Sequence, residues 1–151
     1  MVIPRRITDS QGVSVTGTAA RFIGTHEHSL DTKGRLTLPS RFRASLGEAC
    51  VIGRSQFSDS CLAIWKSEDF QAFSDQLLSQ DLKDETVRRR VRIWSSEAFD
   101  AEIDANGRLA IPSRLRDYAS LAKEVLVIGA LETIEIWSHE NWRSYRGGDD
   151  V

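Results

Sequence analysis

The chain has 151 residues, of which 40% are apolar and 28% are charged, a composition typical of soluble globular proteins. Its length suits one domain of ordinary size or two very small ones. The net charge of −2 does not by itself indicate a nucleic-acid binder, and no run approaches the roughly 18 apolar residues that a membrane-spanning helix needs.

The first 20 residues contain two arginines but no apolar segment after them. They lack the pattern of a secretory signal, and we expect a flexible N-terminal tail over 1–20. The next stretch, FIGTHEHSL (22–30), alternates enough between apolar and polar residues to predict a strand.

The segment DTKGRLTLPSRFR follows from Asp31. Aspartate at the first and Gly34 at the fourth position favour a type I turn, which often closes a hairpin through a glycine bulge. RLTL (35–38) is then the returning strand. Pro39 ends it, because proline has no N–H for a ladder, and a short helix is predicted over SRFRASL (40–46).

Two apolar runs after this helix predict two further strands, and each contains a cysteine, Cys50 or Cys61. We expect buried, reduced thiols, with a disulfide as the alternative. A second helix is predicted after Trp65, with Ser67 as its N-cap, and it reaches about Ser79.

A linker helix is predicted over 79–96, where Val87, Val91 and Trp94 fall on one face. The same helix carries a cluster of arginines that follows three acidic residues. We expect a solvated face with local ion pairs or a contact between subunits, in preference to a DNA contact. The cluster consists of Arg88, Arg89, Arg90 and Arg92.

The second half of the chain repeats the first. DANGRLAIPSRLR begins at Asp104 and is identical to the earlier segment at eight of thirteen positions. Downstream, Val127-Ile128-Gly129 repeats Val51-Ile52-Gly53, Ile136-Trp137 repeats Ile64-Trp65, and Ser138 takes the N-cap place of Ser67. We therefore predict a tandem duplication, with repeats at 21–78 and 97–146 and a C-terminal tail at 147–151.

The predicted fold class is α+β. Each repeat reads strand, turn, strand, helix, strand, strand, helix, and two copies are too few for a solenoid, so we expect them to pair about a pseudo-two-fold axis. Trp65 and Trp137 are expected to fill the core. For Trp94 and Trp142 two locations are considered, the core and a contact between subunits.

Positive charge gathers in the repeated segment. Residues 31–43 carry a net +3 and residues 104–116 a net +2, so the rest of the chain sums to −7. A partner responds to local charge more than to the total.

The arginine directly after each turn glycine, Arg35 or Arg108, could bond guanine bidentately or clamp a phosphate. The alternative is a structural bond to a carboxylate or a carbonyl. The helix arginines suit phosphates better. The expected DNA contacts are Lys33, Arg35, Arg41, Arg43, Arg108 and Arg114, with Arg116 in the same helix group, and the expected turn-formers are Asp31, Gly34, Asp104 and Gly107.

Enzyme chemistry has little support. His26 and His28 share a strand face and could begin a metal site with Asp31, but no further ligand has a suitable spacing. No nucleophile elbow, P-loop or dinucleotide fingerprint is present. We expect no enzyme, no cofactor, no metal and no small-molecule substrate.

The pattern D-x-x-G-R-x-x-x-P, present twice and each time followed by V-I-G and I-W, resembles the MraZ family of bacterial transcriptional regulators. HEHSLDTKGRLTLPSRFR in particular is similar to that family's opening, and the resemblance covers about 21–146. The extension over 1–20 departs from the family's short start.

The resemblance implies an AbrB-like swapped-hairpin β unit, repeated to form a small pseudo-two-fold β-barrel. It also implies a cytoplasmic, nucleoid-associated protein that binds double-stranded DNA at repeats upstream of its own cell-division and cell-wall gene cluster. Repression and a ring-shaped homo-oligomer are the corresponding expectations. The alternative is a self-assembling scaffold module without specific DNA binding, whose arginines hold subunits together.

Overall fold

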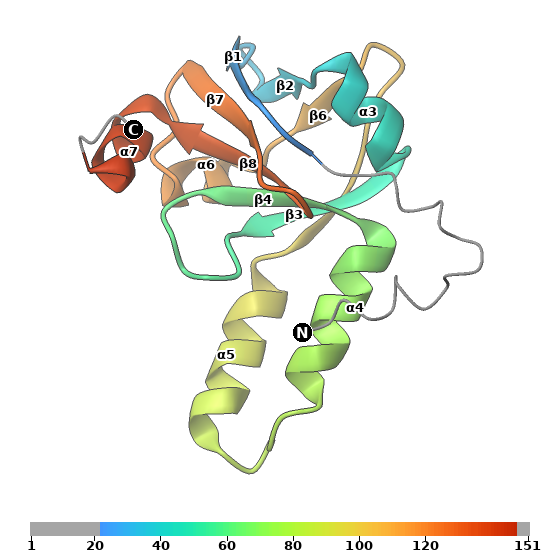
Figure 1. Cartoon of the computed structure of the whole chain (residues 1–151), viewed down its shortest axis with the longest axis vertical. Helices are drawn as coiled ribbons and strands as arrows, with labels where there is room; N and C mark the ends of the chain where they lie inside the picture. Colours follow the sequence, from blue (N-terminus) through green and yellow to red (C-terminus); the bar gives the residue numbers. More distant parts are fainter. Residues whose placement is uncertain (1–21, 148–151) are drawn as a thin grey trace.

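The computed structural model describes residues 22–147 (Figure 1). The tail predicted at 1–20 and positions 148–151 of the C-terminal tail lie outside the described residues. No helix in the described part of the chain is both long and apolar enough to cross a membrane.

The order of elements is the one predicted from the sequence, α+β and repeated twice. The first repeat contains β1 (Thr25–Ser29), β2 (Arg35–Thr37), α3 (Ser40–Leu46), β3 (Ala49–Arg54), β4 (Leu62–Lys66) and α4 (Ser67–Leu78). After α5 (Glu85–Ser96), the second contains β5 (Phe99–Glu102), β6 (Arg108–Ala110), α6 (Ser113–Tyr118), β7 (Glu124–Gly129), β8 (Ile134–Ser138) and α7 (His139–Arg146).

The two repeats exchange strands. β1 pairs antiparallel with β7 of the second repeat, β5 pairs with β3 of the first, and β2 pairs with β6. The predicted turn is present and is closed by the antiparallel bridge between Leu30 and Leu36 and by a hydrogen bond from the Asp31 amide to the Arg35 carbonyl. The ladder of β2, however, is formed with β6 and not with β1, because the backbone groups of β2 are hydrogen-bonded to β6, the equivalent strand of the second repeat.

A pseudo-two-fold axis relates the repeats. It passes through the pair Leu36–Leu109 in the two-stranded β2–β6 sheet and through the pair Ala63–Glu135, where β4 meets β8. Both leucines are fully buried. The sequence duplication is therefore expressed as symmetry within one chain.

The large sheet has the order β1-β7-β8-β4-β3-β5, and within the described residues β1 and β5 do not pair with each other. The predicted β-barrel is accordingly not confirmed, because strand pairing does not close the sheet. The main core lies between this sheet, the β2–β6 sheet and α3 and α6, and it is built from aliphatic side chains such as Leu38, Ile64 and Ile136.

Strand register corrects one sequence match. Val51 lies opposite Trp65 in β4, whereas Leu126, not Val127, lies opposite Trp137 in β8. The counterpart of Val51 is thus Leu126, and the counterpart of Arg54 is Gly129, because each faces the equivalent residue of the neighbouring strand. The identical residues of the two segments therefore differ by one residue in structural register.

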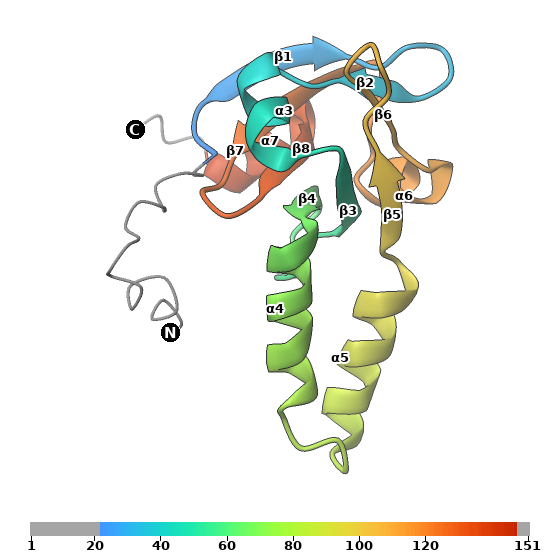
Figure 2. The same ribbon diagram turned by 90° about the vertical axis from the view of Figure 1, so that its right-hand side faces the viewer.

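Helices α4 and α5 form a hairpin that projects from the sheet, away from β2 and β6 (Figure 2). Trp65 is buried beneath them, and Trp94 of α5 packs against it with ring centroids 5.7 Å apart. Trp94 therefore closes an aromatic cluster within the first repeat, while Trp142 contacts Trp137 in the second. Ser138 is confirmed as an N-cap, accepting a hydrogen bond from the Asn141 amide.

The prediction that Ser67 is the N-cap of α4 is wrong. Lys66 occupies that position without a side-chain cap, and Ser67 instead donates to the Ala49 carbonyl at 3.3 Å. Cys50 and Cys61 are confirmed as buried free thiols. Burial raises the pKa of the Cys50 thiol to about 11, so the thiol is neutral and unreactive at ordinary pH.

Candidate nucleic-acid interface

The turn of the first repeat is organised by the Asp31 carboxylate. Its Oδ1 accepts hydrogen bonds from the backbone amides of Lys33 and Arg35, both at 2.9 Å. The Asp31 carbonyl accepts from the Gly34 amide at 2.9 Å, and Gly34 has φ +77°, a left-handed conformation that favours glycine. Aspartate and glycine at this spacing therefore fix the path of the chain.

The second turn repeats this geometry. Asp104 Oδ1 accepts from the amides of Asn106 and Arg108 at 2.9 Å, and Gly107 has φ +79°. The difference between the turns is chemical: the exposed Lys33 of the first is replaced by the exposed Asn106 of the second. The first turn therefore presents one more positive charge than the second.

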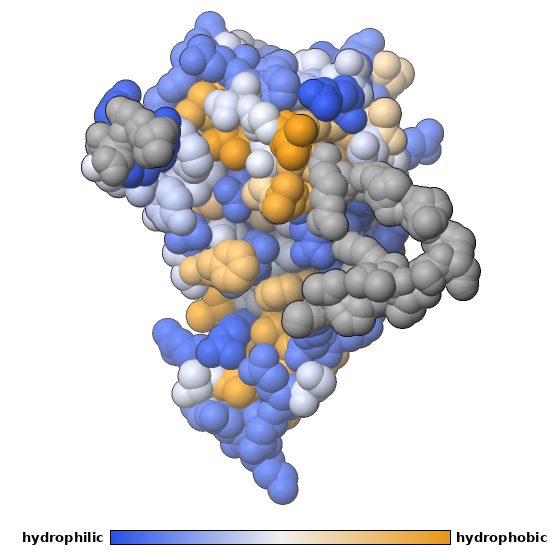
Figure 3. Space-filling view, in the orientation of Figure 1, coloured by the Kyte–Doolittle hydropathy of each residue, from blue (hydrophilic) through white to orange (hydrophobic). Residues whose placement is uncertain are grey.

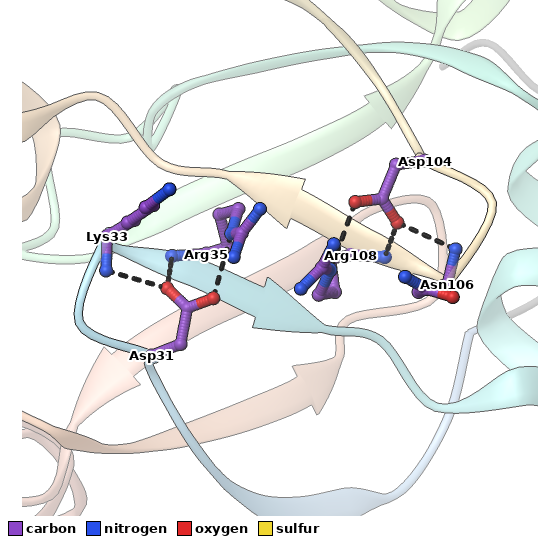
Figure 4. A network of polar contacts seen from close by, with 6 residues as sticks. All are labelled: Asp31, Lys33, Arg35, Asp104, Asn106 and Arg108. Atoms are coloured by element: carbon purple, nitrogen blue, oxygen red, sulfur yellow. Dashed lines mark hydrogen bonds and ion pairs between the residues drawn. The ribbon is translucent and has the colours of Figure 1, made fainter.

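Each turn aspartate also holds the arginine that follows. Arg35 Nε lies 2.8 Å from Asp31 Oδ2, and Arg108 Nε lies 3.0 Å from Asp104 Oδ2. Figure 4 shows the two arginines towards the middle of the ribbon, with the Lys33 and Asn106 turns at opposite ends. The alternative prediction, that these arginines bond a carboxylate, is therefore correct for the Nε atom of each arginine. In the described part of the chain the Nη atoms of both arginines make no hydrogen bond.

Antiparallel pairing brings both arginines onto one surface of the β2–β6 ribbon. Arg35 lies opposite Ala110 and Arg108 opposite Thr37. Side chains alternate along a strand, so these four residues share the outer face while the two buried leucines of the ribbon point inward. We call the face formed by Arg35, Thr37, Arg108 and Ala110 the ribbon face.

Thr37 and Ala110 were not singled out from the sequence. The period-two alternation of RLTL and RLAI places them beside the arginines, but the pairing between β2 and β6 joins segments more than 70 residues apart. Only the idea of symmetric pairing of the repeats could have shown that one face holds both arginines.

Arg43 and Arg116 lie against the turn of the opposite repeat. A β-carbon added at Gly34 would meet the Arg116 guanidinium carbon at 2.7 Å, and one added at Gly107 would meet the same atom of Arg43, also at 2.7 Å. Arg116 Nε donates to the Ile111 carbonyl at 3.0 Å and Arg43 Nη1 to the Leu38 carbonyl at 3.2 Å. Each helix arginine thus supports the other repeat's turn, a role the sequence did not reveal.

Replacing Arg116 by alanine is expected to loosen the turn of the first repeat, although Arg116 belongs to the second. The change removes the guanidinium packed over Gly34 and the bond to the Ile111 carbonyl, which is worth about 1 kcal/mol. Amide hydrogen exchange at Gly34 and Arg35 should accelerate more than at Gly107 and Arg108. Arg43→Ala is the matched control and should show the reverse. Equal acceleration in both turns would contradict the crossed arrangement.

The remaining basic candidates are exposed. Arg41 of α3 and Arg114 of α6 lie one helix position from buried side chains and face solvent. They occupy equivalent positions in the two repeats, at the start of the helix that follows β2 or β6.

Hydrogen bonding holds the turn carboxylates ionised. The backbone amide of Arg35, together with the Arg35 side chain and the Lys33 amide, lowers the pKa of Asp31 to about 2. The amide of Arg108 likewise lowers the pKa of Asp104. Both aspartate–arginine pairs therefore persist throughout the ordinary pH range.

We expect acid to undo the first turn between about pH 4 and pH 2. The folded pKa of Asp31 is below its usual value of 3.8, so its stabilising contribution is complete above that value and is lost as pH falls through about 2. Carbon NMR titration of the Asp31 carboxyl should give a midpoint near 2. A midpoint at or above 3.8 would show that the hydrogen bonds from the backbone amides do not stabilise the ionised carboxylate.

The histidine pair does not gather further ligands. Among the described residues no group of three or more histidine, cysteine, aspartate or glutamate side chains could hold a metal. His26 stacks edge-on against Phe42, with ring centroids 5.2 Å apart. Burial, followed by the nearby His26, lowers the pKa of His28. Both histidines are partly buried on β1, an edge strand of the large sheet.

The linker-helix arginines are partly paired locally, as the sequence predicted. Arg88 Nη2 lies 2.7 Å from Glu85 Oε1, and Arg90 Nη1 donates to Gln80 Oε1 at 3.3 Å. They lie on α5, which projects away from the ribbon face (Figure 2).

Comparison with known proteins identifies the family. The family model described as "MraZ protein, putative antitoxin-like" matches residues 21–93 and 95–148, once for each repeat. The chain belongs to the MraZ family. This confirms the resemblance carried by the doubled D-x-x-G-R-x-x-x-P pattern.

Individual MraZ relatives extend over most of the chain. A protein of Alkaliphilus metalliredigens is 41% identical over 130 residues, covering 86% of this chain and 90% of the relative. A relative from Acetivibrio thermocellus is 37% identical over 130 residues, covering 86% of this chain and 90% of the relative. A relative from Salinispora arenicola is 41% identical over 124 residues, covering 82% of this chain and 86% of the relative. Each is named "Transcriptional regulator MraZ", which agrees with the expectation of a regulator and not an enzyme.

Proposed function

We propose that the protein is a transcriptional regulator that binds double-stranded DNA sequence-specifically through the ribbon face. The observation that carries the proposal is that Arg35 and Arg108 lie, partly exposed, on one face of the ribbon, where the pseudo-two-fold axis relates them and an aspartate orients each. The curated relatives are named transcriptional regulators, which supports the regulatory part of the proposal.

The chemistry of the ribbon suits a DNA groove. The major groove of B-DNA accommodates a two-stranded β-ribbon, and arginine bonds guanine O6 and N7 with two donors. Because Nε of each arginine is engaged by aspartate, the two Nη groups are left to face the bases. A preoriented side chain loses less conformational freedom on binding than a free one. Thr37 and Ala110 are small enough to let the ribbon approach the bases.

The exposed basic residues around the ribbon suit the phosphates. Lys33 is exposed in the first turn, and Arg41 and Arg114 are exposed at equivalent positions of α3 and α6, the helices that follow β2 and β6. Arg43 is a predicted phosphate contact as well, although its Nη1 is engaged by the Leu38 carbonyl and its main effect is to support Gly107. The extra charge of Lys33 gives the first repeat the stronger phosphate contact.

Repeated operator sites and a ring-like homo-oligomer complete the proposal. Several ribbon faces on one ring, meeting repeats upstream of the protein's own cell-division and cell-wall gene cluster, would gain through effective concentration. Occupancy of sites next to a promoter favours repression. The same binding would make the protein cytoplasmic and nucleoid-associated.

The salt dependence of binding tests whether DNA is the partner. We expect wild-type protein to bind DNA upstream of its own gene at physiological salt and to lose affinity steeply as salt rises, by about 0.9 log units per neutralised phosphate for each tenfold increase. Shuffled DNA of equal length and composition is the control. Equal binding to both sequences, or no binding at physiological salt, would contradict the proposal and favour a self-assembling scaffold whose arginines hold subunits together.

A further inference from the structure

A pocket of about 450 Å³ lies between the loop that follows β3, the exposed side of α5 and the end of α6. We call it the arginine pocket, and its principal lining residues are Arg54, Arg89, Arg90, Ile93, Trp94 and Tyr118. Its volume is within the roughly 300–1,000 Å³ typical of small-molecule sites. None of its lining residues belongs to the ribbon face, and α5 projects away from β2 and β6 (Figure 2).

The charge of the pocket is unbalanced. Three arginines line it and no acidic residue does. Arg54 lies over the Tyr118 ring at 4.0 Å. Among the described residues, the Arg90 side chain hydrogen-bonds only the neutral Gln80, and the Arg89 side chain has no hydrogen bond or ion pair. Three cations without a counter-charge favour an anionic occupant.

The rest of the pocket is not simply polar. Ile93 is 40% exposed, and the aromatic side chains of Trp94 and Tyr118 also line the pocket. Gln56 lines it too, and its Oε1 is buried without a hydrogen-bond partner. An occupant with a flat apolar portion and an N–H or O–H donor would cover the apolar wall and satisfy Gln56.

Pseudo-symmetry shows that the fold does not require this arrangement. The register counterpart of Arg54 in the second repeat is Gly129, and the described second repeat has no helix equivalent to α5 after it. The second repeat therefore folds without the cations. On the face shown in Figure 3 the hydrophobic surface forms separate patches between hydrophilic areas.

We propose that the arginine pocket binds a small organic anion that carries a planar ring, of the chemical class of the nucleoside monophosphates. The phosphate lies against Arg54, Arg89 and Arg90, the ring covers Ile93 and Trp94, and a ring or sugar donor bonds Gln56 Oε1. This site goes beyond the regulator's DNA contact and does not depend on it.

Titration of the full-length protein with AMP, GMP, CMP and UMP tests the proposal by calorimetry. We expect saturable binding of at least one with a Kd below about 1 mM. Arg89→Gln should weaken it at least tenfold, because Arg89 lines the pocket without a partner of its own. Arg92→Gln, on the same helix but outside the pocket, is the matched control and should bind as wild type. The matching nucleoside and inorganic phosphate should each bind at least tenfold more weakly, since each supplies half of the contacts.

Three results would overturn the proposal. One is the absence of saturable binding for all four nucleotides up to about 10 mM. Another is binding that survives Arg89→Gln but disappears when Arg35 and Arg108 are changed to glutamine, which would place the anion on the ribbon face. The third is a change in oligomeric mass in Arg89→Gln by light scattering, which would assign the pocket to contact between copies of the chain.

Discussion

Arg35→Ala is expected to reduce affinity for the upstream DNA by about five- to 150-fold for each lost contact, the equivalent of about 1–3 kcal/mol of base discrimination. The substitution removes the Nη donors from the ribbon face. It also leaves the Asp31 carboxylate ionised and without its side-chain partner, because two backbone amides still lower its pKa. Fluorescence anisotropy with the natural and shuffled sequences would measure the loss.

Two further variants separate base reading from charge. Arg35→Lys keeps the charge but lacks the planar fork, so we expect nonspecific binding to be retained and specific binding to be weakened. Arg92→Ala, on the projecting helix, should leave both unchanged. Oligomeric mass and circular dichroism should be the same for all variants. Wild-type affinity in Arg35→Ala would move the contact to Arg108 or to another surface.

Leu36→Ala is expected to lower the free energy of unfolding by about 2–5 kcal/mol, the range for deleting a buried leucine side chain. Leu36 is fully buried and lies opposite Leu109 on the pseudo-two-fold axis. The cavity would open at the junction of the two repeats, where the ribbon packs on the core. Urea denaturation followed by circular dichroism would measure the change.

Thr37→Ala is the matched control for this prediction. Thr37 is the next residue of the same strand, is exposed and points to the opposite face, so its free-energy change should stay within about 0.5 kcal/mol. A loss in Leu36→Ala no larger than that in Thr37→Ala would mean that the ribbon does not anchor the two repeats.

The element order could be predicted because local signals agreed. Aspartate, glycine and proline at fixed places in each segment determine a turn and the end of a strand, and the aliphatic runs match the buried strands β3, β4, β7 and β8. The duplication itself predicted the pseudo-two-fold axis. The linker helix was predicted from Val87, Val91 and Trp94, and Trp94 does pack against Trp65.

Pairing between distant segments could not be predicted from local signals. Nothing in RLTL shows that β2 pairs with β6 and not with β1, because both partners would bury Leu36 equally well. For the same reason the prediction of a closed barrel is not confirmed by the strand pairing. The predicted match of Val51 with Val127 is likewise one residue out of register. At the candidate site, the types of residue were expected, but the Nε bonds to Asp31 and Asp104 and the crossed support from Arg43 and Arg116 depend on the folded geometry.

A base-substitution scan of one upstream repeat, carried out with wild type, Arg35→Ala and Arg108→Ala, tests the ribbon face most directly. We expect each variant to lose discrimination at its own base position, with the two positions related by the pseudo-symmetry of the ribbon, while discrimination elsewhere is retained. Variants that weaken binding equally at every sequence, or that keep wild-type discrimination at all positions, would contradict a role for these arginines in reading bases.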